Sequence, residues 1–89
     1  MNQVEKTLQD RSERYGTFAS HAQISRQLKD AIQSTPKFKV LAADQQEALE
    51  MICHKIARIL NGDPDYTDSW HDIAGYAQLI EKRLQGETL

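Results

Sequence analysis

The sequence predicts an all-α fold, a small helical bundle that contains an antiparallel helical hairpin. Apolar residues recur at helical spacing in three segments, which are separated by Gly16, Pro36, Gly62 and Pro64. No stretch alternates apolar and polar residues as a half-buried strand does. Because 89 residues bury only a limited core, we expect one domain, residues 1–89, that is completed by oligomerisation.

The first segment, residues 1–16, is the most polar part of the chain. Val4 and Leu8 are four residues apart, which places them on one side of a helix. The segment is therefore predicted to be a short helix, with a frayed arm as the alternative.

The segment near 18–34 predicts a longer helix that ends before Pro36. Thr17 or Ser20 can serve as its N-cap, since both side chains accept a hydrogen bond from a free backbone N–H. The apolar residues that follow the helical period are Phe18, Ala22, Ile24, Leu28, Ala31 and Ile32.

The segment near 44–61 predicts the next helix. Asp44 and Glu47 have the spacing of a capping box, and Asn61 with Gly62 provides a stop. Its apolar side carries Leu49, Ile52, Ile56, Ile59 and Leu60.

The turn-rich sequence "DPDYTD" precedes the last predicted helix, near 68–85, which ends at Gly86. Since the connection to the helix near 44–61 is short, the two helices are expected to lie antiparallel. The apolar side of the last helix carries Trp70, Ile73, Ala77, Ile80 and Leu84, so Trp70 is interpreted as a structural residue.

Composition narrows the classes of partner. A formal net charge of −2 and a pI near 5.8 give no overall attraction to nucleic acid or to an anionic membrane. The start "MNQVEKTLQD" is polar and has no apolar h-region, so we expect no secretion, and no apolar stretch approaches the roughly 18 residues that span a bilayer. The single Cys53 lies in an apolar helical run, which indicates a core residue and a reducing, cytoplasmic location.

Charged residues on the helix near 44–61 form a stripe opposite its apolar side, and the simplest interpretation is a solvated face. Lys55 lies between Met51 and Ile59, at the margin of the apolar side, where its aliphatic stem can pack and its ammonium can reach water. The stripe consists of Glu47, Glu50, His54, Arg58 and Asn61.

The last helix has a second stripe beside its apolar side, and this stripe is not uniformly polar. It consists of Asp68, Asp72, Tyr76, Leu79 and Arg83. Gly75 destabilises a helix interior by about 1 kcal/mol relative to Ala, a cost that close approach of another backbone would explain. We therefore expect Gly75, Tyr76 and Leu79 to form an interface between copies of the chain.

Asp68 and Asp72 have two interpretations. Asp68 can be the N-cap of its helix, or Ser69 and Asp72 can form a capping box. Alternatively, both carboxylates lie in a cleft and need a cationic partner or a metal ion.

Two stretches, "RSERYGTF" at 11–18 and "EALEMICHKIARILNGDPDYTDSWHDIAGYA" at 47–77, closely resemble a family of small phage and prophage proteins. More remotely, the chain is similar to all-α nucleotide pyrophosphohydrolases of the MazG and dUTPase type. In those proteins one helix offers E-x-x-E and the next offers E-x-x-D. Glu47 and Glu50 match the first spacing, whereas Asp68 and Asp72 are four residues apart and the usual glutamate is absent.

The remote resemblance implies a Mg²⁺ site formed by four carboxylates, with cationic side chains that neutralise the phosphates of a nucleotide. Tyr15 or Trp70 can stack on a base. The implied metal ligands are Glu47, Glu50, Asp68 and Asp72, and the implied phosphate-binding residues are Lys55 and Arg58.

Three functions remain open at this stage. The first is a Mg²⁺-dependent nucleotide-binding or pyrophosphohydrolase-like protein in the cytoplasm of a bacterial host cell. The second is a helical module that binds a host or phage protein without catalysis. The third is a purely structural small oligomer.

Overall fold

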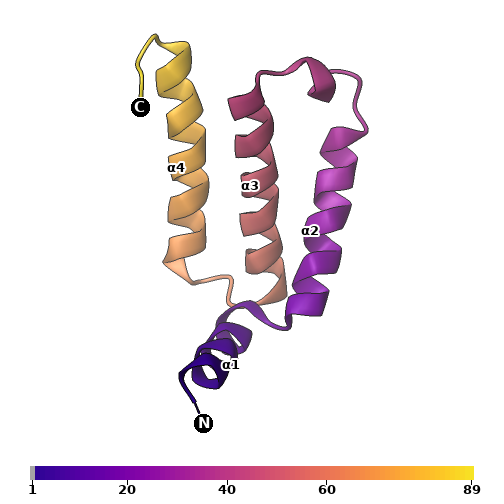
Figure 1. The fold of residues 1–89 in the computed structure, drawn as a ribbon, viewed down its shortest axis with the longest axis vertical. Coiled ribbons are helices and arrows are strands. Elements are labelled where there is room, and N and C mark those ends of the chain that lie inside the picture. The colour runs from indigo at the N-terminus through magenta and orange to yellow at the C-terminus, as the bar shows by residue number, and fades with distance from the viewer. Residues whose placement is uncertain (1) are drawn as a thin grey trace.

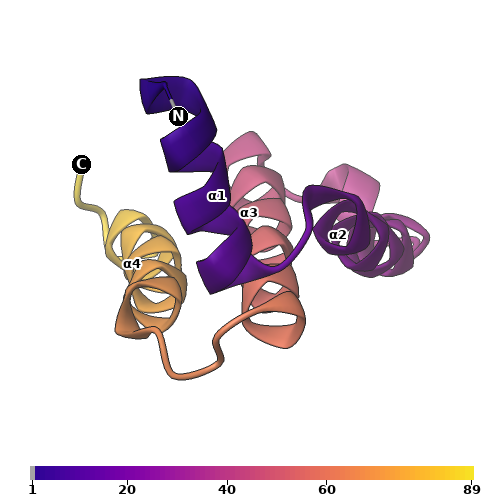
Figure 2. The ribbon, with the colours of Figure 1, turned by 90° about the horizontal axis from the view of Figure 1, so that it is seen from below.

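The computed structural model describes residues 2–89, and these residues form helices joined by short connections, without a strand. Three long helices lie side by side in one layer with α3 in the middle, and α1 crosses one end of that layer (Figures 1 and 2). The predicted all-α fold and the antiparallel hairpin are confirmed. The elements are α1 (Gln3–Tyr15), α2 (Phe18–Gln33), the 3₁₀ turn η1 (Phe38–Val40), α3 (Ala43–Asn61) and α4 (Thr67–Leu84).

Small side chains line the contacts that α3 makes with its two neighbours. Ala48, Cys53 and Ala57 are 7%, 7% and 0% exposed, and no large side chain among the described residues is fully buried. Cys53 is a core residue, as its apolar surroundings in the sequence predicted. Because α2 and α4 flank α3 on opposite sides, the layer is one helix thick and both of its broad faces are open (Figure 2).

Helix α2 begins as predicted, whereas α3 does not. The Thr17 hydroxyl oxygen accepts the N–H of Ser20, which makes Thr17 the N-cap of α2. Helix α3 begins at Ala43, one residue earlier than expected, so Asp44 lies inside the first turn. The predicted capping box is therefore wrong. The Asp44 carboxylate instead accepts two hydrogen bonds from Arg83 of α4, at 2.7 Å each.

Helix α4 faces α3 with only part of its predicted apolar side. Ile73 and Ile80 of that side are half-buried, whereas Trp70, Ala77 and Leu84 are exposed. Asp72 and Arg83 of the second stripe pair with side chains of α3.

The N-cap of α4 is Tyr66, so Asp68 lies in the first turn and Ser69 is buried; neither is the cap that the sequence suggested. Trp70 is 55% exposed, and its indole N–H donates to the Pro64 carbonyl at 2.8 Å. Trp70 thus holds the α3–α4 turn instead of filling the core.

The α1–α2 connection is hydrogen-bonded to the α3–α4 connection. The Asn61 side chain donates to the carbonyls of Tyr15 and Thr17, at 2.6 and 2.9 Å. A Cβ atom on Gly16 would collide with the Asn61 carbonyl, and one on Gly62 would collide with the carbonyl of Arg14. Gly16 also has a φ of 75°, which side chains disfavour. The two glycines therefore allow the close approach that fixes α1 against the end of the layer.

Candidate functional site

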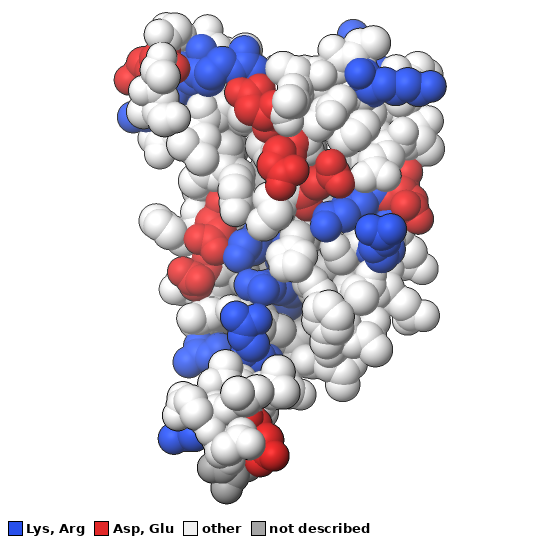
Figure 3. Space-filling view, viewed as in Figure 1, with Lys and Arg blue, Asp and Glu red and all other residues white. Residues whose placement is uncertain are grey.

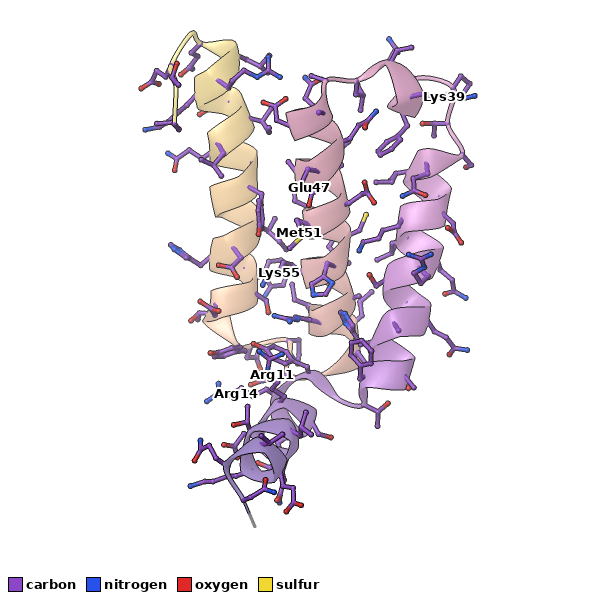
Figure 4. All side chains as sticks on the ribbon, viewed as in Figure 1. Arg11, Arg14, Lys39, Glu47, Met51 and Lys55 are labelled. Atoms are coloured by element: carbon purple, nitrogen blue, oxygen red, sulfur yellow. The ribbon has the colours of Figure 1, made fainter. Side chains whose placement is uncertain are left out.

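A hollow of about 330 Å³ lies in the corner where α1 meets α2 and α3. Its volume falls at the lower end of the range for small-molecule sites. Helix α1 supplies one wall, and the facing ends of α2 and α3 supply the other (Figure 4). We call it the His–Arg pocket; it is lined by Leu8, Arg11, Ser12, Tyr15, Gly16, Phe18, His21, His54 and Arg58.

Two histidines stack edge to face at the back of this pocket. The ring centroids of His21 and His54 are 4.6 Å apart, with the rings nearly perpendicular. Burial, followed by the charge of Arg58, lowers the pKa of both imidazoles, that of His54 to about 4. His21 is only 5% exposed, and its Nδ1 has no hydrogen-bond partner. Both rings are therefore neutral near pH 7, when each offers one donor and one acceptor nitrogen.

The pocket is cationic because its arginines have no carboxylate partner. The guanidinium of Arg58 lies 4.4 Å above the centroid of the Tyr15 ring. Within residues 2–89 the ion pairs within 4.0 Å join Lys55 to Asp72 and Arg83 to Asp44, and no Asp or Glu lines the pocket. Lys and Arg side chains gather where α1 meets α3 (Figure 3), a region in which Figure 4 labels Arg11, Arg14 and Lys55. Because the Lys55 ammonium is held by Asp72, the charge that is available to an anion is that of the pocket arginines, Arg11 and Arg58.

The structure does not bring the four predicted metal ligands together. Asp72 pairs with Lys55 at 2.8 Å, and this hydrogen bond lowers the pKa of Asp72. Glu50 accepts a hydrogen bond from Gln33 of α2 at 2.9 Å, on the side of α3 away from α4. Asp68 is exposed in the first turn of α4.

Glu47 also lies apart from the predicted metal ligands of α4. It precedes Lys55 by eight residues, or about 12 Å of helix, so it is far from the level of Asp72. No group of three or more His, Cys, Asp or Glu side chains in residues 2–89 is arranged to hold a metal ion. The predicted convergence is therefore wrong, and these residues do not fit Mg²⁺ as a set. Binding of Mg²⁺ stays a prediction without a defined set of ligands.

The two predicted phosphate-binding residues, Lys55 and Arg58, lie in different environments. Arg58 lines the His–Arg pocket, whereas the Lys55 ammonium is held by Asp72 and its side chain is 11% exposed. The stripe that was interpreted as a solvated face contains His54, Arg58 and Asn61, all of which contact α1, α2 or their connection. Glu47 alone of that stripe is exposed.

Several pocket residues were not predicted as binding residues from the sequence, among them Arg11, Ser12, Phe18, His21 and His54. A signal for the first was present, because Arg11 and Tyr15 are four residues apart and face one side of α1 directly before Gly16. His21 gave no such signal. It reaches the pocket only because α2 packs against the part of α3 that carries His54.

The predicted interface residues Gly75, Tyr76 and Leu79 line a shallow hollow on α4. A Cβ atom on Gly75 would meet nothing within 4 Å, so no backbone of the same chain explains this glycine. Leu79 is 49% exposed. Contact of this surface with a second copy stays a prediction.

Fold and pocket together define a small α-helical protein with a cationic pocket at a helix junction. Residues 1–84 match the family model described as Domain of unknown function (DUF6378), and the chain belongs to that family. No curated protein and no solved structure shows a significant match. Among residues 2–89, no helix combines the length and the apolar character needed to cross a membrane.

Proposed function

We propose that this protein binds a small phosphate-bearing ligand of the nucleotide class in the His–Arg pocket. One observation carries the proposal: two arginines and two neutral histidines line a hollow of ligand size that contains no carboxylate. Arg58 is half-buried without a carboxylate partner, so it needs a counter-charge, which an anionic ligand provides; Arg11 is exposed and adds its charge at the rim.

Arg58 is the main phosphate ligand in this proposal. Its guanidinium stacks on Tyr15, which limits its rotamers before any ligand arrives. A planar guanidinium held in this way can donate two parallel hydrogen bonds to a phosphoryl group. Arg11 and Ser12 come from α1 on the other wall and add a second charge and a hydroxyl donor.

The rest of the ligand contacts the aromatic side of the pocket. Phe18 is 81% exposed, and its ring centroid lies 6.1 Å from that of His21. An exposed aromatic ring at a pocket rim is a stacking surface for a base, and stacking of this kind contributes about 1–3 kcal/mol per base in nucleic-acid complexes. The neutral histidines offer hydrogen bonds to hydroxyl or base atoms.

The proposal concerns binding and includes no hydrolytic step. The pocket offers arginine, histidine, serine and tyrosine side chains, and none of these is a hard carboxylate ligand for Mg²⁺. Nucleotide hydrolysis of the MazG type would need carboxylates that the fold places elsewhere.

The test is a thermal-shift series followed by calorimetric titration with ATP, AMP, adenosine and inorganic phosphate, each with and without Mg²⁺. A ligand that binds only the native state raises the melting temperature. We expect the nucleotides to raise it, with adenosine far weaker and with no requirement for Mg²⁺.

Arg58→Gln and Arg11→Gln should each weaken nucleotide binding at least about tenfold, in line with the loss of a charge-assisted hydrogen bond. Lys39→Gln is the matched control, since Lys39 is an exposed cation at the opposite end of the layer (Figure 4). An equal loss of nucleotide affinity in all three variants would indicate that only the overall charge of the protein matters, and it would contradict binding in the His–Arg pocket. Absence of any nucleotide response would also contradict it.

A further inference from the structure

The most apolar face of the layer is open. On α3, Leu49 follows Glu47 by two residues, about 200° round the helix, so it lies on the opposite face from Glu47. Leu60, three turns later, shares that face. On α4, Trp70, Ala77 and Leu84 repeat every seven residues and share one side. Their exposed fractions are large: Leu49 39%, Leu60 66%, Trp70 55% and Leu84 60%.

This face contains a hollow of about 310 Å³ between α3 and α4. Leu49 and Ile52 come from one helix and Ala77 from the other, which places the two apolar sides on the same face of the layer. No charged residue lines the hollow. Its lining is Leu41, Gln45, Ala48, Leu49, Ile52, Ala77 and Ile80.

Trp70 stands on the same face, two turns or about 10 Å from Ala77 toward the other end of the layer. Its indole N–H is bonded to the Pro64 carbonyl, so the ring is held in place while more than half of the residue stays exposed. The face therefore carries a fixed aromatic projection at one end and an apolar hollow nearer the other.

We propose that this apolar face is the contact between two copies of the chain, with Trp70 of each copy in the α3–α4 hollow of the other. A two-fold axis that lies in the contact plane, perpendicular to the helix axes and between the projection and the hollow, exchanges the two ends. Each copy then offers both parts, as an isologous interface requires. Tryptophan is also one of the residue types enriched among the residues that dominate interface affinity.

The size and charge of the face fit a second copy. Helix α3 has 19 residues and is about 28 Å long, and two adjacent helices are about 20 Å wide. The projected area is then roughly 560 Å² per copy before side-chain relief is added, near the lower end of the roughly 600–1,000 Å² that each partner buries in a stable complex. The uncharged part of the face is the hollow, since the exposed Glu81 lies on the same side of α4 four residues after Ala77. A hollow without charge suits an apolar ring such as that of Trp70.

A second copy also supplies what the single layer lacks. In the described residues no large side chain is fully buried, although the chain has the apolar periodicity of a core. Two layers packed face to face would bury those side chains between them. The His–Arg pocket opens between α1, α2 and α3 and shares no lining residue with this face, so the proposal is independent of ligand binding.

The test is sedimentation velocity and light scattering over a range from about 1 to 100 µM, combined with fluorescence of Trp70, the only tryptophan. The wild type should be a dimer at the upper end, with emission shifted to the blue relative to dilute protein. Ala77→Glu places a carboxylate in the hollow and should weaken dimerisation at least about tenfold, because it buries an unpaired charge. Ala77 is exposed in the single chain, so the helix itself tolerates the change.

Gln78→Glu is the matched control, with the same charge about 100° round the same helix at another exposed position. It should leave the dimer intact. If Ala77→Glu reduces the helical circular dichroism signal, Leu60→Lys repeats the test at a position that is 66% exposed. A monomeric wild type at about 100 µM would overturn the proposal. A dimer that is unaffected by Ala77→Glu and by Leu60→Lys would also overturn it. A dimer that only Leu79→Glu dissociates would assign the contact to the Gly75–Leu79 surface instead.

Discussion

Lys55 and Asp72 form an ion pair across the α3–α4 contact, with the Lys55 Nζ and the Asp72 Oδ2 2.8 Å apart. The Lys55 side chain is 11% exposed, so its ammonium depends on this partner for compensation. Asp72→Asn should therefore lower the melting temperature while nucleotide binding is unchanged. Thermal unfolding and calorimetric titration of the same variant measure both effects.

Asp44→Asn is the comparison for this variant, because the Asp44–Arg83 pair also joins α3 to α4 but is 44% and 42% exposed. Its loss should reduce stability less, since solvent screens an exposed pair. If Asp72→Asn keeps the wild-type melting temperature and instead abolishes a Mg²⁺-dependent response, Asp72 is a metal ligand and the structural interpretation fails.

Gly16→Ala and Gly62→Ala should each destabilise the fold by at least about 2 kcal/mol, because a Cβ atom collides with backbone of the facing connection. Urea unfolding followed by circular dichroism measures this. Gly86→Ala separates conformational strain from crowding: Gly86 has a φ of 92° but meets nothing within 4 Å, so its substitution should have the smaller effect. Equal effects at all three positions would contradict the crowding at the α1–α2 connection.

Gly75→Ala should stabilise the protein by about 0.5–1 kcal/mol, since alanine is the better helix former and the space beside Gly75 is open. The same urea experiment provides the measurement. A loss of stability that depends on protein concentration would show instead that a second copy approaches Gly75, as the sequence pattern suggested.

Stability should fall as the pH is lowered from about 7 toward 4. The folded pKa of His54 is about 4, below its usual 6.5, so in this window the unfolded chain binds a proton that the native protein does not. The contribution of His54 to the free energy of unfolding is therefore fully present above the pKa that His54 has in the unfolded chain, and it is lost as the pH falls toward the pKa that His54 has in the folded protein. Urea unfolding across the pH range should show this slope.

His54→Gln should flatten the dependence between pH 6.5 and 4, because glutamine does not titrate. Asp44 and Asp72 also have lowered pKa values, but their contributions are lost only below the usual aspartate range, so the two windows separate. An unchanged slope in His54→Gln would assign the effect to another group, with His21 as the first to substitute.

The sequence by itself determined the helices and their order. Helical periodicity, the stops at Gly16, Pro36 and Gly62, and a short connection near Pro64 are local features, and local features set where a helix begins and ends. The antiparallel α3–α4 pair follows from that short connection alone. The N-cap at Thr17 followed from its own side chain. Asp44, in contrast, is not the N-cap of α3, and its carboxylate pairs with Arg83, 39 residues away in the sequence.

Only the tertiary structure decided which side of each helix is covered. With α2 and α4 on opposite sides of α3, the His54–Arg58 side of α3 meets α1 and α2, while the side carrying Leu49 stays open. A helical period identifies an apolar side and a polar side of a helix, but it does not determine which side a neighbouring helix packs against. For α1, the close contacts at Gly16 and Gly62 hold the helix against the end of the layer, where it forms one wall of the pocket.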